Sequence, residues 1–325
     1  MQEQTVKRAL ELLADGTVNR VLGWKTGEFA YDTTPAVFTS AEEVEKSFIY
    51  NDFCGPNLSK YLIKESRKEG KILVFLKPCD TYSFNQLCKE HRLIRENIYV
   101  IGVPCTGKVS AEKIKSSGIK GITGMESDGE NVTVHTLYGD STVKKSDAMG
   151  AKCSTCKSKK HVAFDELIGE DGEVNNDNAR FEMVEKLEAM SADERYEFWR
   201  GELSKCIRCN ACRNVCPACS CENCVFDNPE SGIQQRAAVN SFEENMFHLI
   251  RAFHVAGRCT DCGECSRVCP QNIPLHLLNR KYIKDINEFY GDYQAGADLD
   301  TRPPLNAYTF DDCEPSIVYK KGGNE

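Results

Sequence analysis

The sequence has no long hydrophobic segment. Its longest apolar run suited to a protein core is Ile72–Leu76, and its mean hydropathy over 325 residues is -0.46. A membrane-spanning helix needs about 20 consecutive apolar residues, so we expect no membrane insertion. Residues 1–16 form an amphipathic pattern without the apolar stretch of a signal peptide. These absences favour a cytoplasmic protein.

Positive charge is scarce as well. The chain has 41 Lys and Arg residues against 49 Asp and Glu residues, which gives a formal net charge of -8. No segment rich in Lys and Arg alternates with aromatic residues, although nucleic-acid-binding domains carry a basic patch or stripe. We therefore expect no nucleic-acid partner.

The short signatures of common catalytic sites are also missing. The sequence contains no G-x-S-x-G, P-loop, H-E-x-x-H or G-x-G-x-x-G string. No acid–base or nucleophilic set is visible, so we assign no catalytic residue. The histidines do not follow a metal-site spacing, and we expect them to be structural or surface residues: His91, His135, His161, His248, His254 and His276.

Cysteine, by contrast, is abundant. The chain has 18 cysteines, and eleven of them lie between Cys206 and Cys269. In a reducing compartment such a density argues for bound metal and against disulfides. The chemistry of the protein is therefore expected in this segment.

The only internal repeat is the string C-x2-C-x2-C-x3-C-P, which occurs at Cys206–Pro217 and again at Cys259–Pro270. It is similar to the motif of bacterial two-cluster ferredoxins, in which the fourth cysteine binds the other [4Fe-4S] cluster. Structural zinc knuckles are the alternative. Two [4Fe-4S] clusters follow from the ferredoxin interpretation, each with four ligands. The first set is Cys206, Cys209, Cys212 and Cys269, and the second set is Cys259, Cys262, Cys265 and Cys216.

About forty residues separate the two motifs, more than in a minimal ferredoxin. This insert begins with Cys219, Cys221 and Cys224, and residues 240–256 have a helical pattern. The three cysteines either bind a further metal with a remote residue such as Cys313 or are reduced thiols packed beside the first cluster. We prefer the second interpretation.

The N-terminal half has the pattern of an α/β domain. Helices are expected at residues 3–14 and 41–49, and a strand–helix–strand unit at 71–76, 82–93 and 98–103. Strands this continuously apolar suit a parallel sheet that is buried on both faces. A β-hairpin excursion is expected within residues 119–144.

A domain boundary is expected near residue 175. Residues 170–178 are acidic and rich in Gly and Asn, as in a linker, and a charged helix is predicted over 179–203. We therefore expect an α/β domain with a parallel-sheet core over residues 1–175. Residues 176–325 would form an α-helical domain that contains the two-cluster ferredoxin-like module, its helical insert and a tail.

Four further cysteines form a possible third site. Cys79 follows the first predicted strand and Cys105 the second, and loops that follow parallel strands meet at one sheet edge. Cys153 and Cys156 form a C-x2-C pair that could complete a set of four thiolates. The alternative is that Cys79 and Cys105 are buried thiols at strand ends. Two other cysteines are interpreted as core thiols, Cys54 and Cys88.

The N-terminal half resembles the beta subunits of coenzyme F420-reducing hydrogenases and F420-dependent formate dehydrogenases. The resemblance lies in the order of four motifs along the chain: strand-P-C-D, strand-G-x-x-C, C-x-x-C and D-x-x-x-G (165–169). The resemblance covers about residues 65–170. It implies a third [4Fe-4S] cluster on the third set, and it raises FAD as a further cofactor, for which the chain has no short signature. The third set is Cys79, Cys105, Cys153 and Cys156.

Two functions follow from these patterns. The first is an iron-sulfur subunit of a cytoplasmic, multi-subunit anaerobic oxidoreductase, such as a formate dehydrogenase, a hydrogenase or a heterodisulfide-reductase-like complex. It would relay single electrons between a catalytic and an electron-accepting subunit. The alternative is a flavin-containing subunit that exchanges hydride with F420 or NAD(P)H and passes electrons to the clusters. Only in the second case would the chain itself be catalytic.

Overall fold

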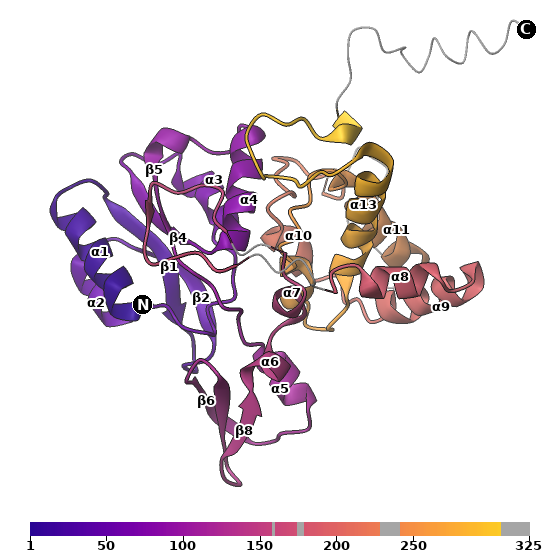
Figure 1. Cartoon of the computed structure of the whole chain (residues 1–325), viewed down its shortest axis with the longest axis horizontal. Coiled ribbons are helices and arrows are strands. Elements are labelled where there is room, and N and C mark those ends of the chain that lie inside the picture. Colours follow the sequence, from indigo (N-terminus) through magenta and orange to yellow (C-terminus); the bar gives the residue numbers. More distant parts are fainter. Residues whose placement is uncertain (158–159, 174–178, 228–240, 307–325) are drawn as a thin grey trace, which may run out of the picture.

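The computed structural model describes residues 1–157, 160–173, 179–227 and 241–306. In this part of the chain an α/β region is followed by a helical region that lies beside it (Figure 1). Both parts of the predicted fold class are therefore present. None of the helices in these ranges has the length and apolar character needed to cross a bilayer.

A largely parallel sheet forms the centre of the α/β region, with the strand order β2-β1-β4-β5-β9. β1 pairs in parallel with β4, β4 with β5, and β5 with β9, whereas β2 and β3 are antiparallel to β1. The predicted parallel pairing of the two apolar strands is confirmed. The strands are β1 (Arg20–Thr26), β2 (Thr33–Phe38), β3 (Phe48–Ile49), β4 (Ile72–Leu76), β5 (Ile98–Gly102) and β9 (Glu166–Leu167).

Helices cover both faces of this sheet, which is why every residue of β4 is buried. α1 (Gln2–Ala14) and α2 (Ala41–Ser47) lie on one side and α4 (Pro78–Lys89) on the other (Figure 1). The short helices η1 (Ser59–Tyr61), α3 (Leu62–Glu65) and η2 (Arg95–Asn97) complete this region.

Two predicted helices have other bounds in the structure, and α4 ends at Lys89 and not at residue 93. α2 ends at Ser47 because Phe48 is extended and pairs with β1. α4 begins at Pro78 and not at residue 82, since proline suits the first turn of a helix and Asp80 bonds back to the backbone of Lys77. Cys79 therefore lies in the first turn of α4 and not in a loop after the strand.

The predicted hairpin excursion is a three-stranded antiparallel sheet that projects from the main sheet (Figure 1). The two ends of this excursion lie side by side, because Val109 and Met149 form an isolated bridge. Gly107 has φ +100°, and a Cβ there would lie 2.4 Å from Met149 Sδ, so glycine permits this closure. The elements are α5 (Ala111–Ser116), β6 (Ile122–Ser127), β7 (Asn131–Thr136), β8 (Ser141–Lys144) and α6 (Lys145–Ala148).

The helical region differs from the prediction at its start. The charged segment forms two helices, and Ser191 caps the second of them in a reciprocal capping box with Glu194. The predicted boundary at residue 175 lies outside the described residues. The helices from the C-x2-C pair onward are α7 (Ala151–Ser154), α8 (Glu182–Glu188), α9 (Ala192–Leu203), α10 (Ala211–Val215), α11 (Ser241–His254), α12 (Glu264–Arg267), α13 (Leu275–Tyr290) and η4 (Pro304–Asn306).

A buried ion pair joins the two regions. Lys152 of α7 pairs with Glu264 of α12, whose side chain is completely buried and which also binds Arg267 at 2.8 Å. Gly263 has φ +66°, and a Cβ there would lie 2.4 Å from Lys152 Cβ. The glycine thus allows the second ferredoxin motif to contact α7.

A second ion-pair group lies beside the first. The Asp261 side chain is 8% exposed and accepts hydrogen bonds from Arg180 and Arg280, each at 2.8 Å. Arg280 of α13 also donates to Thr155 Oγ1 at 2.8 Å, close to the C-x2-C pair. The loop of the second motif is therefore held by charge against the segment that carries Cys153 and Cys156.

We expect Glu264→Gln to lower the thermal unfolding midpoint of the anaerobically purified protein, because it leaves the buried Lys152 ammonium without its charge partner. Removing one partner of a buried ion pair costs about 3–5 kcal/mol. Glu112→Gln is the control, since it removes a carboxylate from an exposed pair with Lys115 and should change the midpoint little. Equal midpoints for the two variants would contradict this role of Glu264.

Candidate metal centres

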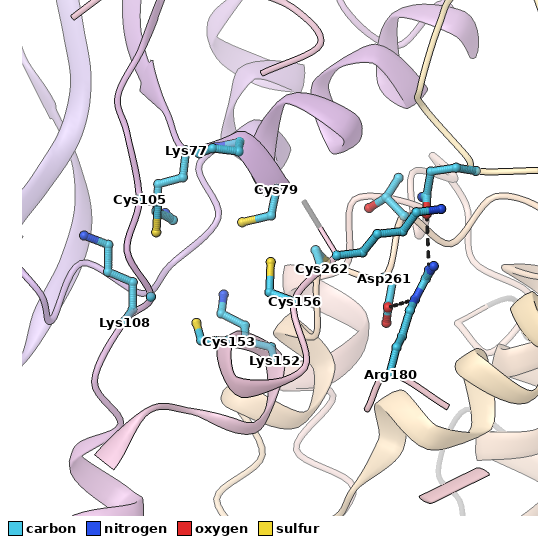
Figure 2. Close-up of a pocket in the computed structure, with 15 residues that line it drawn as sticks. Lys77, Cys79, Cys105, Lys108, Lys152, Cys153, Cys156, Arg180, Asp261 and Cys262 are labelled. Carbon is cyan, nitrogen blue, oxygen red and sulfur yellow. Dashed lines mark hydrogen bonds and ion pairs between the residues drawn. The ribbon is translucent and has the colours of Figure 1, made fainter. Parts of the chain in front are cut away.

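The four thiols of the third set line a single cavity at the carboxyl edge of the main sheet. Cys79 comes from the first turn of α4, Cys105 from the loop after β5, and Cys153 and Cys156 from α7 and the turn that follows it. Figure 2 shows their sulfur atoms around the same space. The structure thus brings together the four residues that the sequence singled out. Cys262 of the second set lies in the wall of the same cavity.

Three buried lysines surround this cavity: Lys77, Lys108 and Lys152 (Figure 2). Their ammonium groups donate to three backbone carbonyls of one loop, namely those of Pro56, Asn51 and Gly55, at 2.8–2.9 Å. Lys77 also pairs with Asp80 at 2.8 Å. One loop therefore orients three positive charges towards four thiols.

The charges in this cavity favour bound negative charge. Burial raises the pKa of the Cys79 thiol well above its usual range and lowers the pKa of the Lys108 ammonium. Burial opposes the charge of Lys152 too, but its pairing with Glu264 and the nearby thiols keeps its pKa raised. An unpaired thiolate is unfavourable in this cavity. The cations stabilise it, and a metal ion that displaces the thiol protons would do the same.

The first set lines a second, separate cavity, and its thiols come from both ferredoxin motifs. Burial raises the pKa of Cys212 to about 11, whereas Cys209 is exposed. The predicted combination of three cysteines from the first motif with Cys269 from the other is therefore present as a spatial group. The four lining cysteines are Cys206, Cys209, Cys212 and Cys269.

His248 also lines the cavity of the first set, although its spacing pointed to no site. Its Nε2 lies 3.2 Å from Cys206 Sγ, and its side chain is buried. Burial, together with the charges of Arg251 and Arg208, lowers the pKa of His248 to about 3. The imidazole is therefore neutral near pH 7 and can donate to the Cys206 sulfur.

Three thiols of the second set are buried, and Cys259 is half-buried. Cys216 and Cys259 pack in one apolar group, and the charges of Cys262 and Cys265 interact with that of Cys216. Burial raises the pKa values of Cys259, Cys262 and Cys265. A hydrogen bond with Cys219 lowers the pKa of Cys216.

The first and third sets each place four thiols around one cavity. Four thiols are the donor set of a [4Fe-4S] cluster, so the residues present at these two sites fit such a cluster. Within the described ranges, no three Cys, His, Asp or Glu side chains are close enough to hold one metal ion.

The remaining cysteines differ from one another. Cys219 bonds to Cys216 of the second set, whereas Cys224 packs with the apolar residues around the first set. We expected all three insert thiols beside the first cluster, so the placement of Cys219 corrects that expectation, and Cys221 is exposed. Cys313 lies outside the described residues. Cys54 and Cys88 belong to the core of the α/β region, as predicted.

Sequence reasoning missed the charged residues around the thiols. Lys77 and Lys152 could have been noticed, because each lies within two positions of a candidate ligand. Arg251 had a signal as well, since it occupies a position of α11 where the helical period calls for an apolar residue. Asp261 and Glu264 flank Cys262, but nothing in their sequence context showed that they pair with distant cations.

Comparison with known proteins finds one domain match and similar sequences. Residues 202–273 match the family model for the 4Fe-4S dicluster domain. The chain is 24% identical to the F420-dependent formate dehydrogenase subunit beta of Methanocaldococcus jannaschii, over 90% of this chain and 91% of that protein. It is 28% identical to the F420-dependent formate dehydrogenase 1 subunit beta of Methanococcus maripaludis, over 90% of each.

Among solved structures, a chain of the F420-reducing [NiFe] hydrogenase complex from Methanosarcina barkeri aligns with 47% of this chain and 58% of its own length. The sequence identity is 14% and the TM-score 0.37, too low to establish a common fold. The sequence relatives and the domain match agree with the resemblance seen in the motifs. Residues 202–273 thus match a 4Fe-4S dicluster domain, and the chain is similar over 90% of its length to the beta subunits of F420-dependent formate dehydrogenases.

Proposed function

We propose that the chain is a cytoplasmic iron-sulfur subunit that relays single electrons through three [4Fe-4S] clusters in a formate dehydrogenase- or hydrogenase-type complex. Such clusters, when bound, take up and release one electron at a time. The observation that carries the proposal is the position of Cys262, which belongs to the second set and lines the cavity of the third. The N-terminal site and the ferredoxin module thus share a wall.

The contacts between the sets support one order along the path. The charges of Cys212 in the first set and Cys265 in the second interact with each other. Cys262 in turn connects the second set to the third. The second set therefore lies in the middle, and electrons would pass between the other two through it.

One end of this path is open to contact with another subunit. Cys209 of the first set is exposed, and its neighbour Ile207 is 57% exposed. At the end of α9, by contrast, Phe198 and Trp199 pack inside their own region, while Tyr196 is exposed.

The protein purified without oxygen should contain about twelve irons per chain, because twelve cysteines supply three four-thiolate sites. Cys153→Ser should lower the count by about four and leave the ferredoxin clusters spectroscopically unchanged. Cys88→Ser is the control, since it changes a core thiol that belongs to no set. The three-cluster proposal fails if wild type binds about eight irons and Cys153→Ser binds the same number.

Ligation across the two motifs makes a separate prediction. Cys269→Ser should disturb the cluster held mainly by the first motif, because Cys269 lines the cavity of Cys206, Cys209 and Cys212. EPR of the reduced protein, compared with Cys224→Ser as the control, measures the effect. Loss of only the cluster of the second motif would contradict the assignment.

A second candidate function is hydride exchange through FAD, and a groove of about 550 Å³ favours it. The groove shares Lys108, Lys152 and Cys153 with the cavity of the third set, and Tyr31 and Phe53 line it as well. Bound FAD would accept hydride from F420 or NAD(P)H and release single electrons. Cations and aromatic rings beside a thiol site suit a flavin dinucleotide.

Titration of FAD into the anaerobic protein tests this second function. We expect about one FAD per chain and at least tenfold weaker binding by Lys113→Glu, since Lys113 lines the groove and would face the phosphates. Lys115→Glu is the matched control, because Lys115 lies on the same helix but outside the groove. Absence of FAD binding, or equal weakening by both variants, would leave electron relay as the function.

A further inference from the structure

Helix α11, which belongs to the insert between the two ferredoxin motifs, lies along both the first and the second set. Near its middle, His248 approaches Cys206 of the first set. Just beyond its end, Val255 packs with Cys216 and Cys259 of the second set. The insert therefore contributes one helical face to both metal centres.

Arg251 occupies this face between the two contacts. It follows His248 by three positions and precedes Val255 by four, which places the three residues on the same side of a helix. The neighbouring Ala252 packs with Cys206, Cys212 and Cys265. The backbone geometry thus directs the Arg251 side chain between the two sets.

The guanidinium of Arg251 is buried, with 2% of the residue exposed. The guanidinium interacts with the Cys265 thiol, and its three nitrogen atoms have no oxygen or nitrogen partner within the described ranges. Burial opposes its charge, but the thiols of both sets outweigh burial and raise its pKa, so the group is charged. The thiols that interact with it are Cys265, Cys212, Cys216 and Cys219.

A buried cation without a carboxylate partner is costly. A [4Fe-4S] cluster with four thiolates carries net negative charge, and its reduction by one electron adds one more negative charge. A cation close to two such clusters stabilises both, and it stabilises the reduced form more than the oxidised form. The insert thus has a physical reason to keep an arginine where an apolar residue would pack at lower cost.

We propose that Arg251 is a positioning residue for electron transfer that raises the reduction potentials of the first and second clusters together. The proposal rests on the proposed function, since it requires both clusters. Because one charge acts on both clusters, the two potentials would rise together, and the free-energy change for passing an electron between them would change little.

The test is an EPR-monitored titration of the whole protein with dithionite, which supplies one electron to each cluster. Arg251→Gln should lower the equilibrium constant for one-electron reduction of both clusters at least tenfold, which corresponds to about 59 mV. Arg251→Lys retains the positive charge and should change both constants less than threefold. Iron and sulfide analysis comes first, and a protein without clusters would contradict the proposed function itself.

Arg208→Gln provides the matched control. Arg208 lines the cavity of the first set, and its charge interacts with Cys206 and Cys212, both of the first set. The same substitution at this position should therefore shift one cluster and leave the other unchanged. If Arg251→Gln shifts only one cluster, shifts neither, or matches Arg251→Lys, the inference is overturned.

If Arg251→Gln loses its clusters, a measurement on the wild-type protein still tests the proposal. With ¹⁵N-labelled arginine, pulsed EPR should detect nitrogen coupling at both reduced clusters, and Arg251→Lys should abolish the coupling at the second cluster. Retention of that coupling would overturn the placement of Arg251. Cluster loss in both Arg251→Gln and Arg251→Lys would also overturn the inference, because the residue would then serve assembly and not potential.

Discussion

The structure depends on positive charges that balance the negative charge of buried thiolates. Most thiols of the three sets are half-buried or fully buried, and thiolates in such surroundings are stable only near positive charge. Buried cations meet this need at two places. Lys77, Lys108 and Lys152 surround the third set, and Arg251 lies between the first and second sets.

Lys152 and a further buried cation, Arg280, also hold the molecule together. Lys152 pairs with Glu264, and Arg280 joins Asp261 to Thr155. Both acidic residues flank Cys262 in the second motif, so the ion pairs that join the two regions lie where the second set meets the third. Stability of the interface and proximity of the metal centres therefore arise from one group of contacts.

The chain topology explains why a site can form from distant segments. Parallel strands β4 and β5 end at one edge and deliver Cys79 and Cys105 there. The small-sheet excursion then returns to its origin through the Val109–Met149 bridge, so that Cys153 and Cys156 reach the same edge. Close packing at Gly107 permits this return.

By itself, the sequence singled out the cysteines of the three predicted sets and located the two apolar parallel strands. Two signals sufficed, the repeated spacing of the motifs and the apolar runs ahead of Cys79 and Cys105, because both are local properties of the chain. The helix start at Pro78 was missed since the first turn of α4 contains few apolar residues. The break at Ser191 was missed because a capping box within a charged segment leaves the helical period intact.

Only the tertiary structure decided which charges face the thiols and which sets are neighbours. Glu264 with Lys152 and Asp261 with Arg180 are pairs between residues far apart in the chain, and no spacing rule predicts such partners. The position of Arg251 between two sets likewise depends on how α11 packs. Coulomb interactions act through space and not along the sequence, so their partners are fixed only when the regions dock.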